Sequence, residues 1–283
     1  MAAEPRDRLA VFGHLLRFWR QAFGLSQEEL AGRAGISARH VSFLENGRTA
    51  ASRASVLALA AGLTLGPREI AVLLLSAGFF PDAPAPDLGD AVHADLRETL
   101  VLMLRHTDPF PSMVMDSCGE IRLVNRAWVF AHRHYLGDIA DGLHLNAMLL
   151  FLHERGWRRF APDWERIACV FLMLLQQEVI IRRDARASQA MARILRLPGV
   201  PADWARRGAG WSTEQGDYRL DLTGRDGRVH GFRVVHHTVG GTPYGGEERL
   251  IIQTVYPEAG SPVIDRAWLE RRAAGLAHPL CPY

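Results

Sequence analysis

Two close pairs of histidines are the residues of this sequence that could bind a metal ion or haem. His132 and His134 lie two apart in a segment with a helical pattern, and such side chains point to different faces of a helix. His236 and His237 are adjacent in a strand-like segment, where neighbouring side chains point to opposite sides. Neither pair can readily hold one ion between its two rings. We therefore expect no metal and no cofactor, and metal or haem binding remains the minor alternative.

The sequence contains no recognisable motif around a catalytic nucleophile. It contains no Gly-x-Ser-x-Gly motif, no HExxH motif and no phosphate-binding P-loop. The three cysteines, Cys118, Cys169 and Cys281, are odd in number and far apart, which indicates neither a disulfide framework nor a zinc site. We expect that the protein is not an enzyme.

Composition and charge limit the domain number, the location and the kind of partner that the protein can have. A chain of 283 residues is long enough for two domains, each with its own core. No apolar run approaches the roughly 18 residues that a membrane span needs, and the N-terminus lacks an apolar signal segment, so we expect a cytoplasmic protein without a membrane partner. The first 80 residues carry nine arginines against six acidic residues, whereas residues 81–283 carry 24 against 25. A polyanionic partner should therefore bind the first 80 residues.

Residues 25–52 combine the signals of two short helices. Ser26 and Glu29 form a capping box, so a helix is expected to begin at Gln27. Gly35 permits a left-handed turn, and Ser37 can cap the second helix. The inward residues recur at helical spacing: Leu30, Ala31, Ala34, Val41 and Leu44. Together these signals predict a helix–turn–helix.

The stretch LSQEELAGRAGISARHVSFLENGRT resembles the phage-repressor type of helix–turn–helix, the XRE family. The resemblance covers about residues 9–77 and implies an all-α DNA-binding domain of five helices over residues 1–78. Its first helix would be Leu9–Phe23, its fourth Ser52–Gly62 and its fifth Pro67–Ala77. It also implies a partly buried ion pair between Arg20 and Glu45, as part of the architecture.

The resemblance further implies which side chains contact double-stranded operator DNA. Outward residues of the second helix of the motif would read base edges in the major groove, with Arg39 expected on a guanine. Phe43 has two equal interpretations: contact with a thymine methyl group, or packing against its own domain. Other polar residues would contact phosphates. The complete predicted set is Gln27, Ser37, Ala38, Arg39, His40, Ser42, Phe43, Asn46, Arg48 and Arg53.

A proline-containing segment, GFFPDAPAPDLGD, indicates a linker over residues 79–90. Beyond it, the pattern predicts a helix through Leu96, Leu100 and Leu104, and then a hairpin leading into a helix from Asn125. Further helical and strand-like segments follow and predict an α+β domain over residues 91–260, with a tail at 261–283. The hairpin strands are Met113–Met115 and Ile121–Val124, the helical segments lie around Leu143–His153 and Trp164–Arg183, and the remaining strands are Tyr218–Leu222, Val229–Thr238 and Arg249–Tyr256.

Segments spread over nearly the whole chain, including REIAVLLLSAGFFP, LVNRAW, LPGVPADW and GGTPYGGEERLIIQTVYP, resemble the MmyB-like family of regulators. In that family an XRE domain precedes a PAS-like ligand-binding domain, similar to domains that accept fatty acids. The chain departs from the family pattern at Tyr244-Gly245-Gly246 and at Gln253, where relatives usually carry acidic residues. The resemblance implies a one-component transcriptional regulator, repressor or activator, that forms a homodimer.

A cavity in the second domain would have apolar walls and few polar groups, which suits a small lipophilic ligand such as an aliphatic acid held by an arginine. The predicted ligand-binding set is Phe110, Met113, Met115, Arg122, Asn125, Trp128, His132, Trp164, Phe171, His236 and Ile252. Phe130, Phe151 and Met173 are further wall candidates, and about two thirds of the apolar candidates should simply be core. The alternative is a dimerisation or partner-protein module without a small molecule.

Overall fold

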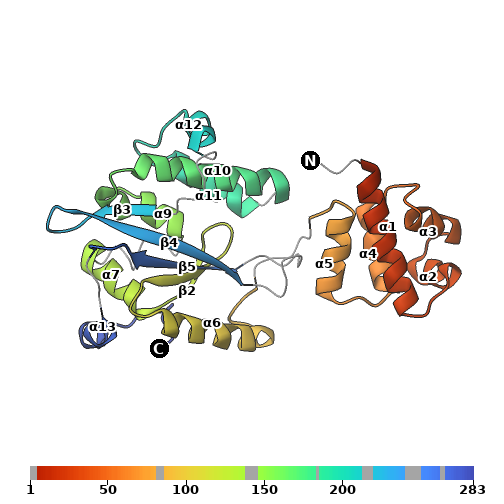
Figure 1. Ribbon diagram of the computed structural model, residues 1–283, viewed down its shortest axis with the longest axis horizontal. Coiled ribbons are helices and arrows are strands. Elements are labelled where there is room, and N and C mark those ends of the chain that lie inside the picture. The colour runs from red at the N-terminus through yellow and green to blue at the C-terminus, as the bar shows by residue number, and fades with distance from the viewer. Residues whose placement is uncertain are drawn as a thin grey trace. The chain divides into compact units, whose positions relative to one another are not determined.

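The computed structural model describes residues 5–80, 86–137, 146–182, 185–211, 219–239, 250–261 and 265–283. They form two compact units, one before and one after the proline-containing segment (Figure 1). The first is all helical and the second combines helices with one antiparallel sheet, as expected from the sequence. Among the described residues, no helix is both long and apolar enough to cross a membrane.

The first unit consists of five helices around one core. They are α1 (Pro5–Ala22), α2 (Gln27–Ala34), α3 (Ala38–Glu45), α4 (Arg53–Gly62) and α5 (Pro67–Ser76). The expected helices are therefore confirmed, and only α1 begins clearly earlier than predicted. The fully buried residues include Leu16, Leu30, Val41, Leu44, Val56, Leu59 and Leu73.

Local signals explain how α2 and α3 begin and end. The Ser26 side chain accepts a hydrogen bond from the Glu29 backbone N–H at 3.1 Å, and the Glu29 carboxylate accepts one from the Ser26 N–H at 2.7 Å. Gly35 ends α2 with φ 66°, and the Ser37 hydroxyl then accepts from the His40 N–H at 3.2 Å. Helix α1 crosses α3 so closely that a Cβ on Gly13 would lie 2.5 Å from the Leu44 carbonyl oxygen. This close approach excludes side chains at residue 13.

The second unit is built on a five-stranded antiparallel sheet in the order β2-β1-β5-β4-β3. Its strands are β1 (Ser112–Met115), β2 (Ile121–Val124), β3 (Arg219–Thr223), β4 (Val229–Val239) and β5 (Leu250–Pro257). All five agree with the expected strands within the described residues. Met113 of β1 pairs with Val124 on one side and with Gln253 on the other, so the early hairpin joins the late strands in one sheet.

Helices cover both faces of this sheet (Figure 1). The described helices of this unit are α6 (Ala94–Thr107), α7 (Arg126–Leu136), α9 (Ala147–Leu152), α10 (Trp164–Arg182), α11 (Ala185–Leu195), α12 (Trp204–Trp211) and α13 (Arg266–Ala273). Two 3₁₀ turns, Ala91–His93 and Trp157–Phe160, join them. Of the helices, α11, α12 and α13 pack on other helices. One face packs on α6 through the cluster Leu100, Leu104, Val114, Leu123 and Ile252, and the other packs on α7 and α9.

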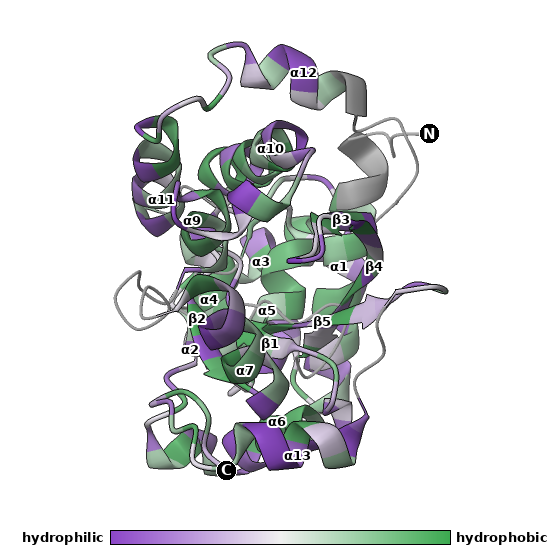
Figure 2. Ribbon diagram, turned by 90° about the vertical axis from the view of Figure 1, so that its left-hand side faces the viewer, coloured by the Kyte–Doolittle hydropathy of each residue, from purple (hydrophilic) through white to green (hydrophobic). Residues whose placement is uncertain are grey.

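Helices α11, α12 and α13 were not expected from the sequence. Along α11, hydrophobic and hydrophilic residues share the helix (Figure 2), and Ala187, Ala190 and Ile194 are buried against α9 and α10. Residues 265–283, expected as a tail, instead contain α13 and pack on α7 through Leu269 and Ala273. The Leu280 carbonyl also accepts a hydrogen bond from the Val124 N–H at 2.9 Å. The last described segment is thus an integral part of the second unit.

Candidate functional sites

The outward face of α3 carries the side chains expected to read DNA. Val41 and Leu44 point into the core, because they occupy the buried positions of the helix. Arg39 is exposed, and His40 and Ser42 are half-buried on the remaining face, with Ser37 exposed at the N-terminus of the helix. Of the residues predicted to read bases, Arg39, Ser42 and Phe43 are at least partly accessible, whereas the half-buried Ala38 packs partly against the core.

Phe43 lies against two arginines of its own domain. The Arg39 guanidinium carbon is 5.1 Å from the centre of the Phe43 ring, and that of Arg48 is 5.9 Å from it. Both distances suit cation–π attraction, in which the electron-rich ring face attracts a positive charge. Phe43 thus packs against two arginines of its own domain, and its contact with a thymine methyl group stays a prediction.

A buried carboxylate joins the first three helices. Glu45 is only 2% exposed, and Arg20 donates to both of its oxygens, from Nε at 2.6 Å and from Nη2 at 3.0 Å. Burial acts to raise the pKa of Glu45, but hydrogen bonds from Arg20, Gln27 and Arg17 outweigh it and lower the pKa below its ordinary value. The expected Arg20–Glu45 ion pair is confirmed.

Three of the predicted phosphate contacts have partners within the domain. The Gln27 side-chain amide donates to Glu45 at 2.9 Å, and the Arg53 guanidinium donates to the Phe80 carbonyl at 2.7 Å. Asn46 accepts from Arg17 Nη2 at 2.8 Å and donates to the Ser42 carbonyl at 2.7 Å. These bonds hold each of the three side chains in a fixed direction.

Sequence reasoning missed Arg17, whose guanidinium reaches Asn46 and Glu45 from α1. The signal was present, because Arg17 lies three residues before Arg20 and therefore on the same face of that helix.

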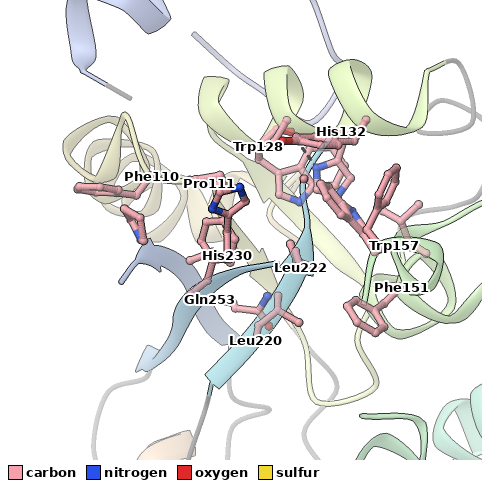
Figure 3. A pocket seen from close by; sticks show the side chains of 18 of the residues that line it. Phe110, Pro111, Trp128, His132, Phe151, Trp157, Leu220, Leu222, His230 and Gln253 are labelled. Atoms are coloured by element: carbon pink, nitrogen blue, oxygen red, sulfur yellow. Dashed lines mark hydrogen bonds between the residues drawn. The ribbon is translucent and has the colours of Figure 1, made fainter. Parts of the chain in front are cut away.

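The second unit contains a cavity of about 330 Å³ between the sheet, α7, α9 and the start of α10. Figure 3 shows its side chains pointing into a common space, from Phe110 and Pro111 on one side to Phe151 and Trp157 on the other. The apolar lining residues include Pro109, Met113, Trp128, Ala131, Tyr135, Ala147, Leu150, Phe160, Phe171, Leu220, Leu222, Phe232, Val255 and Pro257. The polar ones are His132, Thr223, Arg225, Asp226, His230 and Gln253.

Of the residues predicted to bind a ligand, the cavity brings together Phe110, Met113, Trp128, His132 and Phe171. Met115 and Ile252 lie in buried clusters instead. Ile252 faces α6, and because alternate residues of a strand point to opposite sides of a sheet, Gln253 and Val255 face the cavity. The sequence predicted the strand here but not which of its faces lines the cavity.

The other predicted residues have structural partners outside the cavity wall. Arg122 forms an ion pair with the buried Asp116 at 2.9 Å. Asn125 caps α7, accepting from the Trp128 N–H at 2.9 Å. The guanidinium carbon of Arg158 lies 4.6 Å from the centre of the Trp164 ring, which it stacks over.

His236 hydrogen-bonds to the cavity residue Gln253 at 3.0 Å, next to the cavity wall but not in it.

His132 is the central polar group of the cavity wall formed by α7. Its Nδ1 lies 2.8 Å from the Trp128 carbonyl, and its Nε2 accepts a hydrogen bond from Trp157 Nε1 at 2.8 Å. The ring also stacks on Trp128 with 3.6 Å between ring centres. Burial lowers the pKa of His132 to about 3, so the ring is neutral at physiological pH with both nitrogens occupied.

The β3–β4 hairpin supplies cavity residues that sequence reasoning missed. Leu220 and Leu222 point into the cavity from β3, and Thr223, Arg225 and Asp226 follow at the turn. The two strands on either side of this turn were expected from the sequence, but none of these residues was assigned to the cavity. The signal that could have found the leucines is the alternation of apolar residues along β3.

The histidine pairs do not form a metal site in the described part of the chain, where no group of three or more potential ligands comes together. His132 lies in the cavity wall, whereas His134 stacks on Phe130 with 5.5 Å between ring centres. The two rings thus point to different faces of α7, as their spacing predicted.

Both units resemble known proteins. Residues 96–262 match the model of the MmyB-like transcription regulator ligand-binding domain, and residues 11–73 match that of a helix–turn–helix domain. A solved structure, the restriction-modification controller protein C.AhdI from Aeromonas hydrophila, is 38% identical over 24% of this chain and 99% of its own, with a TM-score of 0.23. No curated protein matches the chain.

The first match covers the cavity and most of the second unit, and the second covers the core of the first unit. A helix–turn–helix domain binds DNA, and the combination is that of a regulator of transcription. Because the ligand-binding-domain model spans more than half of its length, this chain belongs to the family of MmyB-like transcription regulators.

Proposed function

We propose that the cavity of the second unit binds a small lipophilic ligand, an aliphatic acid such as a fatty acid, and that its occupancy changes binding to operator DNA. The observation that carries the proposal is the cavity itself: about 330 Å³ of space with mainly aromatic and aliphatic walls and few polar groups. Such a lining favours an apolar body with one polar group. The domain is PAS-like in this proposal, supported by an early hairpin, intervening helices and late strands that share one sheet.

In the first unit, we propose that α3 enters the major groove with Arg39 on a base and with Arg48 and His40 near phosphates. Support comes from the exposed side of α3 and from its rigid attachment to α1 and α2 through Glu45. One such domain contacts only a few base pairs, so specificity requires two half-sites and hence a homodimer. This function places the protein in the cytoplasm with the DNA.

The direct test is to extract the purified full-length chain with organic solvent and identify the released compounds by mass spectrometry. A co-purifying aliphatic acid in near-stoichiometric amount is the expected result, and adding it back should change operator affinity. If nothing apolar is released, and saturated acids from octanoate to hexadecanoate leave the unfolding temperature unchanged, the proposal is wrong, because a ligand that binds the folded state must stabilise it.

The second candidate is a partner-protein or dimerisation module without a small molecule. One observation favours it: α10 exposes apolar side chains, with Leu174 and Ile181 each 48% exposed on the same side of the helix. Under this alternative the extract would be empty, and polar substitutions at these two residues would disrupt assembly.

A further inference from the structure

Polar groups are distributed unequally around the cavity. On the α7 wall, His132 is neutral and both of its ring nitrogens are occupied, and the indole N–H of Trp157 is used in one of those bonds. This wall therefore offers a ligand little more than apolar surface. Of the remaining polar residues, Gln253 lies on β5 and is hydrogen-bonded to His236, and the other four lie on the hairpin: Thr223, Arg225, Asp226 and His230.

Arg225 is the one arginine among the described residues that line the cavity, and no lysine occurs in the chain. Its Nη2 donates to the His134 carbonyl, and its guanidinium carbon lies 5.8 Å from the centre of the Tyr135 ring. The side chain thus reaches from the hairpin to α7. Within the described structure its Nε and Nη1 donate to no protein atom, and a guanidinium offers five N–H groups in all.

Asp226 is the negative charge next to Arg225, but its carboxylate is engaged by the turn. Its Oδ1 accepts the Arg228 N–H at 3.1 Å and lies 3.3 Å from His230 Nε2. The pKa of Asp226 is lowered, first by the backbone hydrogen bond from Arg228, so it stays ionised. A ligand entering on this side therefore meets one available cation and one fixed anion.

We propose that the turn of the β3–β4 hairpin is the head-group site of the cavity, where Arg225 binds the carboxylate of an aliphatic acid. The hydrocarbon chain then lies against the apolar walls, including Trp128, Leu150 and Phe171. This inference rests on the proposed ligand function and adds to it the orientation of the ligand and the residue that selects an acid. A guanidinium binds carboxylates well because two parallel N–H groups match the two oxygens.

The test uses the purified full-length chain and ligands that differ only in head group. A series of saturated acids from octanoate to hexadecanoate first identifies the best chain length, and the alcohol and the amine of that length are then compared by calorimetry. The wild type should bind the acid about tenfold more tightly than the alcohol, and the amine most weakly.

The test becomes specific when one variant removes a positive charge at the site and another removes a negative charge. Arg225→Gln should remove the preference for the acid and leave alcohol binding unchanged, whereas Arg225→Lys should retain part of it. Asp226→Asn should strengthen acid binding, because it removes a nearby negative charge. Arg228→Gln is the matched control, since Arg228 lies in the same turn but outside the cavity lining.

The possible outcomes separate the head-group site from the proposed ligand function. If Arg225→Gln weakens acid and alcohol equally, Arg225 acts only by tying the hairpin to α7, and the head-group site is wrong. Undiminished acid preference in that variant also overturns the site but leaves the proposed function standing. If the wild type binds none of the acids, alcohols or amines, both proposals fail. Thermal melts establish that each variant is folded.

Discussion

At the scale of single residues, the packing of Phe43 organises the DNA-reading face of α3. Its ring lies within cation–π distance of both Arg39 and Arg48. Exposed contacts of this kind contribute about 0.5–1 kcal/mol each. Phe43→Leu keeps the apolar bulk but removes the aromatic ring, so both arginines should lose their preferred positions.

We expect Phe43→Leu to weaken operator binding about three- to tenfold, consistent with loss of one or two such contacts. The measurement is fluorescence anisotropy with a duplex selected from a random library by the wild type. Phe43→Tyr, which keeps an aromatic face, should bind nearly as the wild type does. Equal losses in the two variants would instead indicate a direct contact of the Phe43 ring with DNA.

Arg39 and Arg48 should differ in their effects on sequence choice. Arg39→Ala is expected to weaken operator binding by about 1–3 kcal/mol and to relax the sequence preference at one position. Arg48→Ala should weaken all duplexes more evenly and reduce the salt slope by about one. Titrations with operator and with mixed-sequence DNA at several salt concentrations separate the two, and identical behaviour would contradict these roles.

Buried His132 should make stability depend on pH. Its pKa of about 3 in the folded protein lies below the ordinary value of 6.5, so the unfolded chain binds the proton more readily. Its stabilising contribution is complete above pH 6.5 and is lost as the pH falls toward 3, by about 1.4 kcal/mol per unit. Urea unfolding at pH 7 and pH 5 should show a smaller loss for His132→Gln than for the wild type. Equal losses would exclude His132 as a source of the pH dependence.

At the scale of elements, α13 completes the second unit although the family match ends at residue 262. Leu269 is 1% exposed and packs with Ala127 and Ala273 against α7, the helix that carries Trp128 and His132. His278 also contacts the Trp128 ring, with 5.6 Å between ring centres. The segment 265–283 thus supports the cavity wall from outside the cavity.

We expect Leu269→Ala to destabilise the protein by about 2–5 kcal/mol, since it opens a cavity in a packed interface. The matched control is Arg271→Ala on the same helix, which is exposed and should change stability by at most about 0.5 kcal/mol. Urea unfolding followed by tryptophan fluorescence measures both. A neutral Leu269→Ala would show that α13 is dispensable for folding.

At the scale of the whole molecule, regulation requires the ligand to distinguish two states of the dimer, because equal affinity for both shifts nothing. We expect a dimer by light scattering and a symmetric footprint with half-sites about one helical turn apart. Saturating acid should change operator affinity, and operator should change acid affinity by the same factor. A monomer that protects a single asymmetric site would overturn this scheme.

The sequence by itself determined the elements of the first unit and most of those in the second. The signals are local: Ser26 with Glu29, the left-handed Gly35 and the Ser37 cap act within a few residues of one another. The strands were also predictable, because Ile121–Val124 alternates and Met113–Met115 is a short apolar run. Helices α11, α12 and α13 were missed. The pattern of α11 is distinct, because Ala187, Ala190, Met191 and Ile194 recur at helical spacing. In α13, by contrast, only Leu269 and Ala273 are buried.

Only the tertiary structure decided which side chains share the cavity. Ile252 and Gln253 are adjacent in one predicted strand, yet the first faces α6 and the second the cavity, because helices pack on both faces of the sheet. Arg225 reaches the His134 carbonyl from 91 residues away, and Trp157 reaches His132 from 25. Caps and turns depend on neighbours along the chain, whereas a cavity depends on the folding together of distant segments.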